Sequence, residues 1–311
     1  MIIVPHLEWH VSHSCNLTCE SCIHFTNHGF TEKISIETLK EWYSLWNERI
    51  SPQRMVILGG EPLLNENIIE IIYLTKEMWK QPENGNFWIT TNGMLIDKHP
   101  DLPKALKENG CMLQISIHGN RNTPEYWKKM EKTFDKIKEW DSLHNIKLID
   151  CDNDEDFSKL KPTKDESYIV FRDMVSDWSR SYNGFGINSE PFDDGDPEKS
   201  WRNCVAGQEC FQLYDGKIYK CCMTAYLNLQ KKKYGDLLSK KWNPYLKYTP
   251  LNHNCSDSEI VDFFNRKVES VCGMCPKNPR IFQKKDPTLP LSFHSKNNNF
   301  KFNNSNNFKV K

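Results

Sequence analysis

The sequence predicts an α/β protein, with a partial (β/α)6 TIM-type barrel followed by a smaller, Cys-rich C-terminal domain. Short apolar runs alternate with amphipathic stretches through the first two-thirds of the chain, and this alternation indicates parallel βαβ units. Six such units form a partial barrel, because closing an eight-unit barrel takes about 250 residues. After about residue 175 the alternation stops, and cysteines become dense between Cys204 and Cys275.

Six short apolar segments are the predicted strands: 7–11, 55–58, 87–90, 112–117, 146–149 and 168–171. Ser35 is a candidate N-cap for the first helix. The apolar face of that helix follows a helical spacing and comprises Leu39, Trp42, Tyr43, Trp46 and Ile50. Three later helices are marked by Ile68, Ile71, Ile72 and Trp79, by residues 103–107, and by Trp127, Met130, Phe134 and Ile137.

We expect four segments along the chain: the barrel over 1–180, a linker over 181–199, the Cys-rich domain over 200–282 and a low-complexity extension over 283–311. The linker is rich in Asn, Gly, Asp and Pro, which favour turns and loops. The extension is biased toward Asn, Lys and Phe, so we expect it to be loosely docked at most.

Charge, cysteine content and the lengths of the apolar runs indicate which partners and which compartment to expect. The 311 residues include 41 basic and 41 acidic side chains, so bulk attraction to nucleic acid or to anionic lipid is not expected. The lysine runs at 231–233 and 240–241 are the candidates for a local basic patch. Twelve cysteines without a secretion signal indicate metal binding in a reducing compartment. No run is long enough to span a membrane, and we expect a cytoplasmic protein.

Cys15, Cys19 and Cys22 form the most informative motif, with the spacing C-x3-C-x2-C. A full protein ligand set for an iron–sulfur cubane is four cysteines. Three thiolates therefore leave one iron open for another ligand. The alternative is a closed zinc site, in which His24 or His28 supplies the fourth ligand.

Three further motifs follow predicted strands. Gly59-Gly60-Glu61-Pro62 follows the second, Thr90-Thr91-Asn92-Gly93 ends the third, and the run from Gln114 to Gly119 ends the fourth. The carboxyl ends of parallel strands meet at one face of a barrel, and active sites are built there. We therefore expect these motifs to lie beside the cysteine loop. The alternative for each is an ordinary turn, because Gly-Gly and Asn-Gly are turn dipeptides.

Together these residues resemble the radical S-adenosylmethionine (SAM) enzymes over about residues 6–175. The resemblance implies a [4Fe–4S] cluster on Cys15, Cys19 and Cys22, with SAM chelating the open iron. The residues that the resemblance places around SAM are Gly59, Gly60, Glu61 and Pro62 at its amino group, Thr91 and Asn92 beside it, Ser116 at its ribose and Arg172 at its carboxylate. A surface position for Arg172 is the alternative.

His118 is the candidate catalytic residue, and it departs from the pattern of many relatives, which carry Asp at this position. The sequence leaves two roles open for it: contact with substrate, or a hydrogen-bonded histidine at the rim of the barrel.

The C-terminal cysteines resemble the auxiliary-cluster domains called twitch and SPASM. Cys204, Gly216 and Cys221 have the spacing C-x11-G-x4-C, and Cys272 and Cys275 form C-x2-C. No cysteine follows Cys275, so the match is to the shorter twitch type with one auxiliary cluster, which we expect to be [4Fe–4S]. The expected ligands are Cys204, Cys221, Cys272 and Cys275, with Cys222 as the alternative to Cys221. An Asp215-Gly216 hairpin would bring the first two together, and a four-cysteine zinc site is the alternative. We expect Cys111 and Cys151 to be small buried hydrophobes.

The resemblance implies the following chemistry. A reduced cluster passes one electron to SAM, and the resulting 5′-deoxyadenosyl radical abstracts hydrogen from a substrate. An auxiliary cluster that accepts the next electron favours a net two-electron oxidation. The implied partners are a flavodoxin- or ferredoxin-type reductant and a small-molecule or peptide substrate. No N-terminal leader-binding domain is expected, which favours a small molecule, a sugar or a nucleotide. The alternatives are a peptide- or nucleic-acid-modifying radical SAM enzyme and a non-catalytic, zinc-stapled binding protein.

Overall fold

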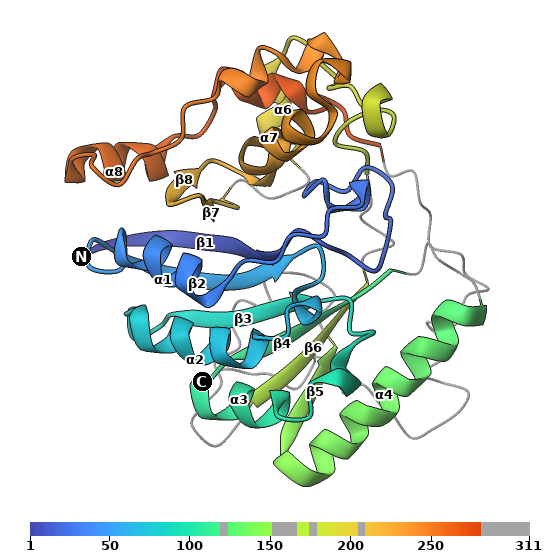
Figure 1. Ribbon diagram of the computed structural model, residues 1–311. Helices are drawn as coiled ribbons and strands as arrows, with labels where there is room; N and C mark the ends of the chain where they lie inside the picture. The colour runs from blue at the N-terminus through green and yellow to red at the C-terminus, as the bar shows by residue number, and fades with distance from the viewer. Residues whose placement is uncertain (119–123, 151–166, 174–178, 205–208, 281–311) are drawn as a thin grey trace.

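A single eight-stranded sheet runs through the computed structural model, which describes residues 1–118, 124–150, 167–173, 179–204 and 209–280 (Figure 1). Its strands are β1 (Ile2–Ser12), β2 (Ile50–Gly59), β3 (Asn86–Thr91), β4 (Met112–Ile117), β5 (Ile146–Asp150), β6 (Ser167–Asp173), β7 (Gln212–Tyr214) and β8 (Lys217–Tyr219). Their order is β5-β6-β4-β3-β2-β1-β7-β8. Every neighbouring pair is parallel except β7 and β8. The predicted α/β class is confirmed.

Helices connect the first five parallel strands, from β1 to β5, as the alternating sequence pattern predicts. The helices are α1 (Ile36–Ser44), α2 (Ile68–Met78), α3 (Leu102–Asn109), α4 (Pro124–His144), α6 (Pro197–Arg202), α7 (Cys222–Tyr234) and α8 (Asp257–Asn265). Figure 1 shows α1, α2 and α3 side by side along the sheet, while the C-terminal helices lie beyond β1, at the top of the view.

Side chains alternate between two environments along the central strands. On β1, Leu7, Trp9 and Val11 pack into the core formed with the helices. The Trp9 ring lies 5.3 Å from that of Tyr43 on α1. The residues of opposite parity on β1 are polar but are also buried: His6, Glu8, His10 and Ser12. Because successive strand residues point to opposite faces, the second face of β1 is polar.

The last two barrel strands are exchanged in space. β6 pairs with β4 over Leu113–Ile117, and β5 lies outside it at the edge of the sheet. Both strands are short apolar runs, and nothing in their composition determines which one is central.

The first helix is shorter than its apolar spacing predicts. α1 ends at Ser44, and Ile50 instead begins β2, where it pairs with Ile2. Trp46 stays buried between these elements, and its Nε1 donates a hydrogen bond to the Gly216 carbonyl at 2.9 Å. Burial in the sheet therefore replaces helical burial for Ile50.

The C-terminal unit continues the barrel sheet. The predicted hairpin is present, with Asp215 and Gly216 at φ of 52° and 67° in its two-residue turn, as a type I′ turn requires. Its first strand pairs with β1 at Glu8 and Gln212. Part of the expected linker is packed, because Tyr182 and Ser189 are fully buried. The extension over 283–311 and Cys151 lie outside the described residues.

Candidate functional site

The loop after β1 carries Cys15, Cys19 and Cys22 and packs directly on the end of β2. The Gly60 amide donates to the Ser12 carbonyl and the Glu61 amide to the Ser14 carbonyl, each at 2.8 Å. A Cβ on Gly60 would overlap the Ser14 carbonyl and lie 2.8 Å from Cys15 Cβ. Gly60 therefore lets the two loops meet, and it fixes where Cys15 stands. Its predicted contact with SAM stays a prediction, as does that of Gly59.

Glu61 ties the end of β2 to the end of β3. Its fully buried carboxylate accepts hydrogen bonds from the Leu63 amide at 3.0 Å, the Thr91 hydroxyl at 2.5 Å and the Asn92 amide at 2.8 Å. Burial raises the pKa of Glu61 to about 7, although these hydrogen bonds lower it. Pro62 follows as the first residue of a buried 3-10 turn. Contact between Glu61 and the SAM amino group stays a prediction.

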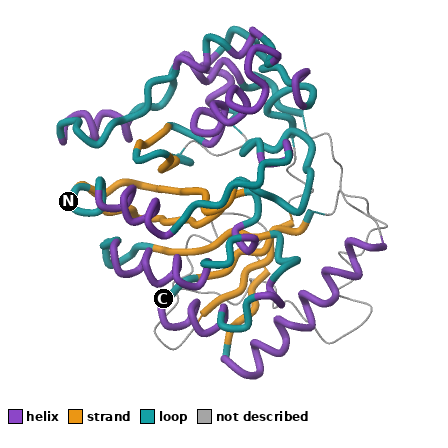
Figure 2. The backbone as a smooth tube through the Cα atoms, in the orientation of Figure 1, coloured by secondary structure: helices purple, strands orange, loops and turns teal. Residues whose placement is uncertain are grey.

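Asn92 links this edge to the cysteine loop. Its side-chain amide donates to Asn16 Oδ1 at 2.7 Å, and Asn16 lies between Cys15 and Cys19. Ser116 is buried near the end of β4. Arg172 stands opposite Ser116 in the pairing of β4 with β6, and its side chain lies outside the description. The predicted SAM residues thus occupy one end of the sheet, which Figure 2 shows as the end where the loops after β1 and β3 gather.

The three thiols of the loop are close enough to influence one another. Burial raises the pKa of Cys15 strongly, Glu61 raises it further, and Cys22 and Cys19 add smaller increases. Metal coordination reverses such a preference, because a bound metal holds cysteines as thiolates. Three cysteine donors on one loop, with a strand end packed against them, fit an iron–sulfur cluster that keeps one iron without a protein ligand.

Both histidines of the zinc alternative contact other side chains. His24 Nδ1 lies 2.8 Å from His10 Nε2. Both ring nitrogens of His28 face tyrosine hydroxyls, those of Tyr234 at 3.1 Å and Tyr182 at 3.2 Å. Among the described residues, no three Cys, His, Asp or Glu side chains converge on one metal ion. The two histidines instead anchor the cysteine loop to the rest of the chain.

His118 lies against the cysteine loop. Its Nδ1 is 3.7 Å from Cys19 Sγ, and its backbone amide donates to the Tyr126 hydroxyl at 2.9 Å. The ring therefore stands at the end of β4, with its Nδ1 directed at a predicted cluster ligand. A contact with substrate stays a prediction.

The four C-terminal cysteines of the predicted auxiliary site lie near one another. Burial raises the pKa of Cys275, and Cys204, Cys221 and Cys272 raise it further. Cys221 stands at the N-terminus of α7, where burial raises its pKa and hydrogen bonds from Thr224 lower it. A helix N-terminus favours thiolate. Four cysteines are a full ligand set for an iron–sulfur cubane, and the role of these four as its ligands stays a prediction.

Cys222, the alternative ligand, is more deeply buried. It is 1 % exposed, and its pKa is raised by burial and then by Cys221, Cys210, Glu8 and Cys204. Cys111, which we expect to be a small buried hydrophobe, is fully buried.

Sequence reasoning missed a buried polar network beside the cysteine loop. His10 contacts His13 at 3.0 Å, and its ring stacks on Tyr226 of α7 with centroids 3.6 Å apart. Gln212 bridges the strands by donating to Glu8 at 2.5 Å and accepting from Tyr226 at 3.0 Å. Burial lowers the pKa of His13 to about 4 and has the same effect on His24. The sequence feature that could have predicted this network is the polar residue at every second position along β1, from His6 to Ser12.

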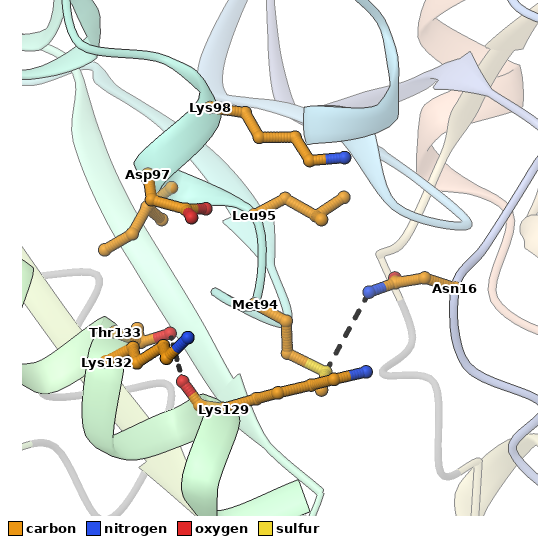
Figure 3. Close-up of a pocket in the computed structure, with 9 residues that line it drawn as sticks. Asn16, Met94, Leu95, Asp97, Lys98, Lys129, Lys132 and Thr133 are labelled. Carbon is orange, nitrogen blue, oxygen red and sulfur yellow. Dashed lines mark hydrogen bonds between the residues drawn. The ribbon is translucent and has the colours of Figure 1, made fainter.

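A pocket of about 220 Å³ adjoins the cysteine loop. Figure 3 shows Asn16 on one side, Met94 and Leu95 across the centre, and Lys98 and Lys129 above and below. Ile96, Asp97, Lys132 and Thr133 complete the lining. Figure 3 shows Asp97, Lys132 and Thr133 on the side away from Asn16. An opening with three ammonium groups and one carboxylate suits a small anionic group.

Comparison with known proteins finds a family match in the N-terminal half of the chain. Residues 9–157 match the radical SAM superfamily. The chain carries a radical SAM domain. Such a domain implies a [4Fe–4S] cluster and SAM as its cofactors.

Curated relatives of this radical SAM domain are GTP 3′,8-cyclases. That of Clostridium perfringens (strain SM101 / Type A) is 29 % identical over 138 residues, which are 43 % of this chain and 41 % of the relative. That of Clostridium acetobutylicum is 28 % identical over 170 residues, or 54 % and 48 %. The chain spans less than half the length of these relatives.

Two solved structures are similar over more of the chain. The structure of anSMEcpe with bound AdoMet is 15 % identical and covers 78 % of this chain and 80 % of its own, with a TM-score of 0.41. BtrN in complex with AdoMet and 2-DOIA is 13 % identical and covers 85 % and 82 %, with a TM-score of 0.37. In the part of the radical SAM chain that the structure describes, no helix has both the length and the apolar character needed to cross a bilayer.

Proposed function

We propose that this protein is a radical SAM enzyme that removes hydrogen from a small-molecule substrate and completes a net two-electron oxidation. The observation that carries the proposal is the meeting of the cysteine loop with the ends of β2, β3 and β4. Asn16 of the loop is bound by Asn92, and Asn92 is in turn held by Glu61. This arrangement supports a cofactor site assembled from three strands, where barrel active sites lie.

Each group of residues has a distinct task in this proposal. Cys15, Cys19 and Cys22 hold the cluster. When bound, the cluster and SAM together supply a 5′-deoxyadenosyl radical, the hydrogen-abstracting species. Glu61 holds Asn92 beside the loop, and Ser116 and Arg172 contact SAM.

The C-terminal cysteine site provides the proposed acceptor for the second electron that the substrate loses. The substrate loses one hydrogen atom, then one further electron and a proton. We propose that a second [4Fe–4S] cluster on Cys204, Cys221, Cys272 and Cys275 takes that electron. A flavodoxin- or ferredoxin-type protein is the proposed source of the electron that starts the reaction.

A phosphorylated or nucleotide-type substrate is the form of the proposal that we favour. The relatives of the domain are named for a reaction of GTP. The pocket beside Asn16 presents Lys98, Lys129 and Lys132 to an anionic group. At about 220 Å³ it is smaller than the pockets of about 300–1,000 Å³ that hold whole drug-sized ligands, so it would hold one charged end of the substrate.

Metal content and SAM cleavage test the proposal. We expect about eight iron atoms per chain after anaerobic reconstitution, because two cubanes hold four each. Cys19→Ala should abolish 5′-deoxyadenosine formation under reducing conditions. Cys272→Ala should lose about half the iron and keep 5′-deoxyadenosine formation without substrate. Cys255→Ser, a half-buried cysteine outside both sets, is the matched control and should change neither.

Two results would contradict the proposal. Zinc without iron would mean that the protein is a metal-stapled binding protein and not a radical SAM enzyme. Four iron atoms with one zinc would keep the radical SAM reaction and remove the proposed electron acceptor.

A further inference from the structure

We propose that His118 donates a hydrogen bond to the Cys19 thiolate and thereby raises the reduction potential of the cluster that Cys15, Cys19 and Cys22 hold. This inference rests on the proposed function, because it needs the cluster on those cysteines. It assigns His118 a tuning role toward the cofactor rather than a reaction with substrate.

The geometry places the His118 ring, at the end of β4, beside a buried sulfur. His118 Nδ1 lies 3.7 Å from Cys19 Sγ, and Cys19 is only 7 % exposed. The backbone of His118 is held by the Tyr126 hydroxyl at 2.9 Å, and Tyr126 is itself 3 % exposed. The half-buried ring thus stands on the end of β4, between α4 and the cysteine loop.

The chemistry of the two groups determines which one donates. A thiolate that ligates a metal carries no proton, so it can only accept. A neutral imidazole has one N–H and one acceptor nitrogen. The proton must therefore sit on Nδ1, which faces the sulfur, and no change in the charge of His118 is required.

The three cluster sulfurs have different hydrogen-bond neighbours. The Leu17 amide donates to Cys15 Sγ at 3.4 Å, and the Thr26 hydroxyl lies 3.5 Å from Cys22 Sγ. Both of these neighbours belong to the cysteine loop itself. His118 comes from a different strand, so changing it removes a donor to Cys19 and leaves the donors within the loop in place.

The direction of the effect follows from charge. Reduction adds one electron to the cluster, and a hydrogen-bond donor to a ligand sulfur stabilises the more negative state. Hydrogen bonds to the sulfurs are among the factors that determine iron–sulfur potentials. A donor that favours the reduced state about tenfold raises the potential of a one-electron couple by about 59 mV.

Redox titration of the reconstituted full-length protein, followed by EPR, tests the inference. The relevant signal is the one whose shape changes when SAM is added. We expect His118→Phe to shift its midpoint to lower potential, by an amount corresponding to about tenfold in the reduction equilibrium. His118→Asn keeps an N–H donor near the Nδ1 position and should restore most of the shift. His253→Phe, at an exposed histidine, should leave the midpoint unchanged.

A second measurement needs no substitution. Pulsed EPR of the reduced wild-type protein carrying isotope-labelled histidine should detect a histidine nitrogen coupled to the SAM-responsive cluster. Absence of that coupling would overturn the inference even if the Phe variant cannot hold a cluster.

The outcomes separate this inference from the proposed function. An unchanged midpoint in His118→Phe with full iron content overturns the role of His118 and leaves the radical SAM assignment intact. An Asn variant that behaves like Phe also overturns it, because packing rather than donation would then explain the shift. A wild-type protein without a SAM-responsive cluster overturns both.

Discussion

Glu61 shows how one side chain organises the candidate site. Its carboxylate joins three protein donors from the segments after β2 and β3, and it has no exposed surface. Burial of a carboxylate disfavours its charged form, so the hydrogen bonds offset only part of the cost and its pKa rises to about 7.

The raised pKa of Glu61 predicts how stability depends on pH. The ordinary value is 4.5, so between pH 4.5 and 7 the folded protein keeps a proton that the unfolded chain releases. The free energy of unfolding should therefore fall as pH rises through this window, at about 1.4 kcal/mol per pH unit, or on the order of 3 kcal/mol. Urea unfolding of wild type and Glu61→Gln from pH 5 to 8 measures this contribution, because the variant lacks the titrating proton.

The control for this pH dependence is a glutamate whose pKa is not raised by burial. Glu66→Gln removes an exposed glutamate whose pKa is lowered by Lys33, so its difference from wild type should stay constant between pH 5 and 8. Parallel curves for wild type and Glu61→Gln would show that Glu61 does not titrate in this range.

Helix α1 illustrates what local sequence determines at the scale of an element. Ser35 is the N-cap that the sequence predicts, and it accepts a hydrogen bond from the Thr38 amide at 3.2 Å. The buried residues Leu39, Trp42 and Tyr43 follow the predicted face. The end of the helix could not be predicted from its apolar spacing. Ile50 has the spacing of the helix face, but it pairs with Ile2 as the first residue of β2.

Loss of the Ser35 cap should destabilise the protein measurably. Replacing an N-cap serine by alanine leaves a helix N–H unsatisfied and costs about 1 kcal/mol. We expect Ser35→Ala to lower the free energy of unfolding in urea by that amount. Ser44→Ala, at the exposed end of the same helix, should stay within about 0.5 kcal/mol of wild type. Equal effects from both variants would mean that the cap contributes nothing specific.

In the whole molecule, the barrel and the Cys-rich unit share one sheet, and each of the two apolar clusters contains residues from both. β7 pairs with β1, and Phe211, Leu213 and Ile218 pack in the same apolar cluster as Trp9 and Ile57. Arg49 of the barrel also pairs with Asp257 of α8 at 2.7 Å. A second apolar cluster, centred on α7, includes Phe25 of the cysteine loop. The predicted boundary at 181–199 therefore separates two cysteine sites, but neither apolar cluster ends there.

This continuity predicts that the two parts unfold together. Hydrogen exchange of the native protein should give β7, β8 and the buried first turns of α7 the same opening free energy as β1, because exposing one edge exposes buried Glu8 and Gln212 on the other. Mass spectrometry of peptides from 2–12 and 212–230 measures both. Much faster exchange in the C-terminal peptides would show an independently opening unit.

Local and periodic features could be predicted from the sequence. Apolar periodicity located all six barrel strands, the Asp215-Gly216 turn predicted the hairpin, and the strand-end motifs predicted where the residues proposed to contact SAM would stand. These succeed because each depends on a few neighbouring residues and on the rule that parallel strands end at one edge.

Which distant groups meet could not be predicted from the sequence, because it depends on the packing of the whole fold. The order of β5 and β6, the ring of His118 against Cys19 and the polar network from His10 to Tyr226 join segments that are far apart in the chain. Cys204, Cys221, Cys272 and Cys275 were grouped by resemblance, and in the fold the first three lie close enough to Cys275 to raise its pKa. The spacing of residues in the sequence shows which side chains are available at each strand end. Contacts between strands and helices depend on how the whole sheet packs.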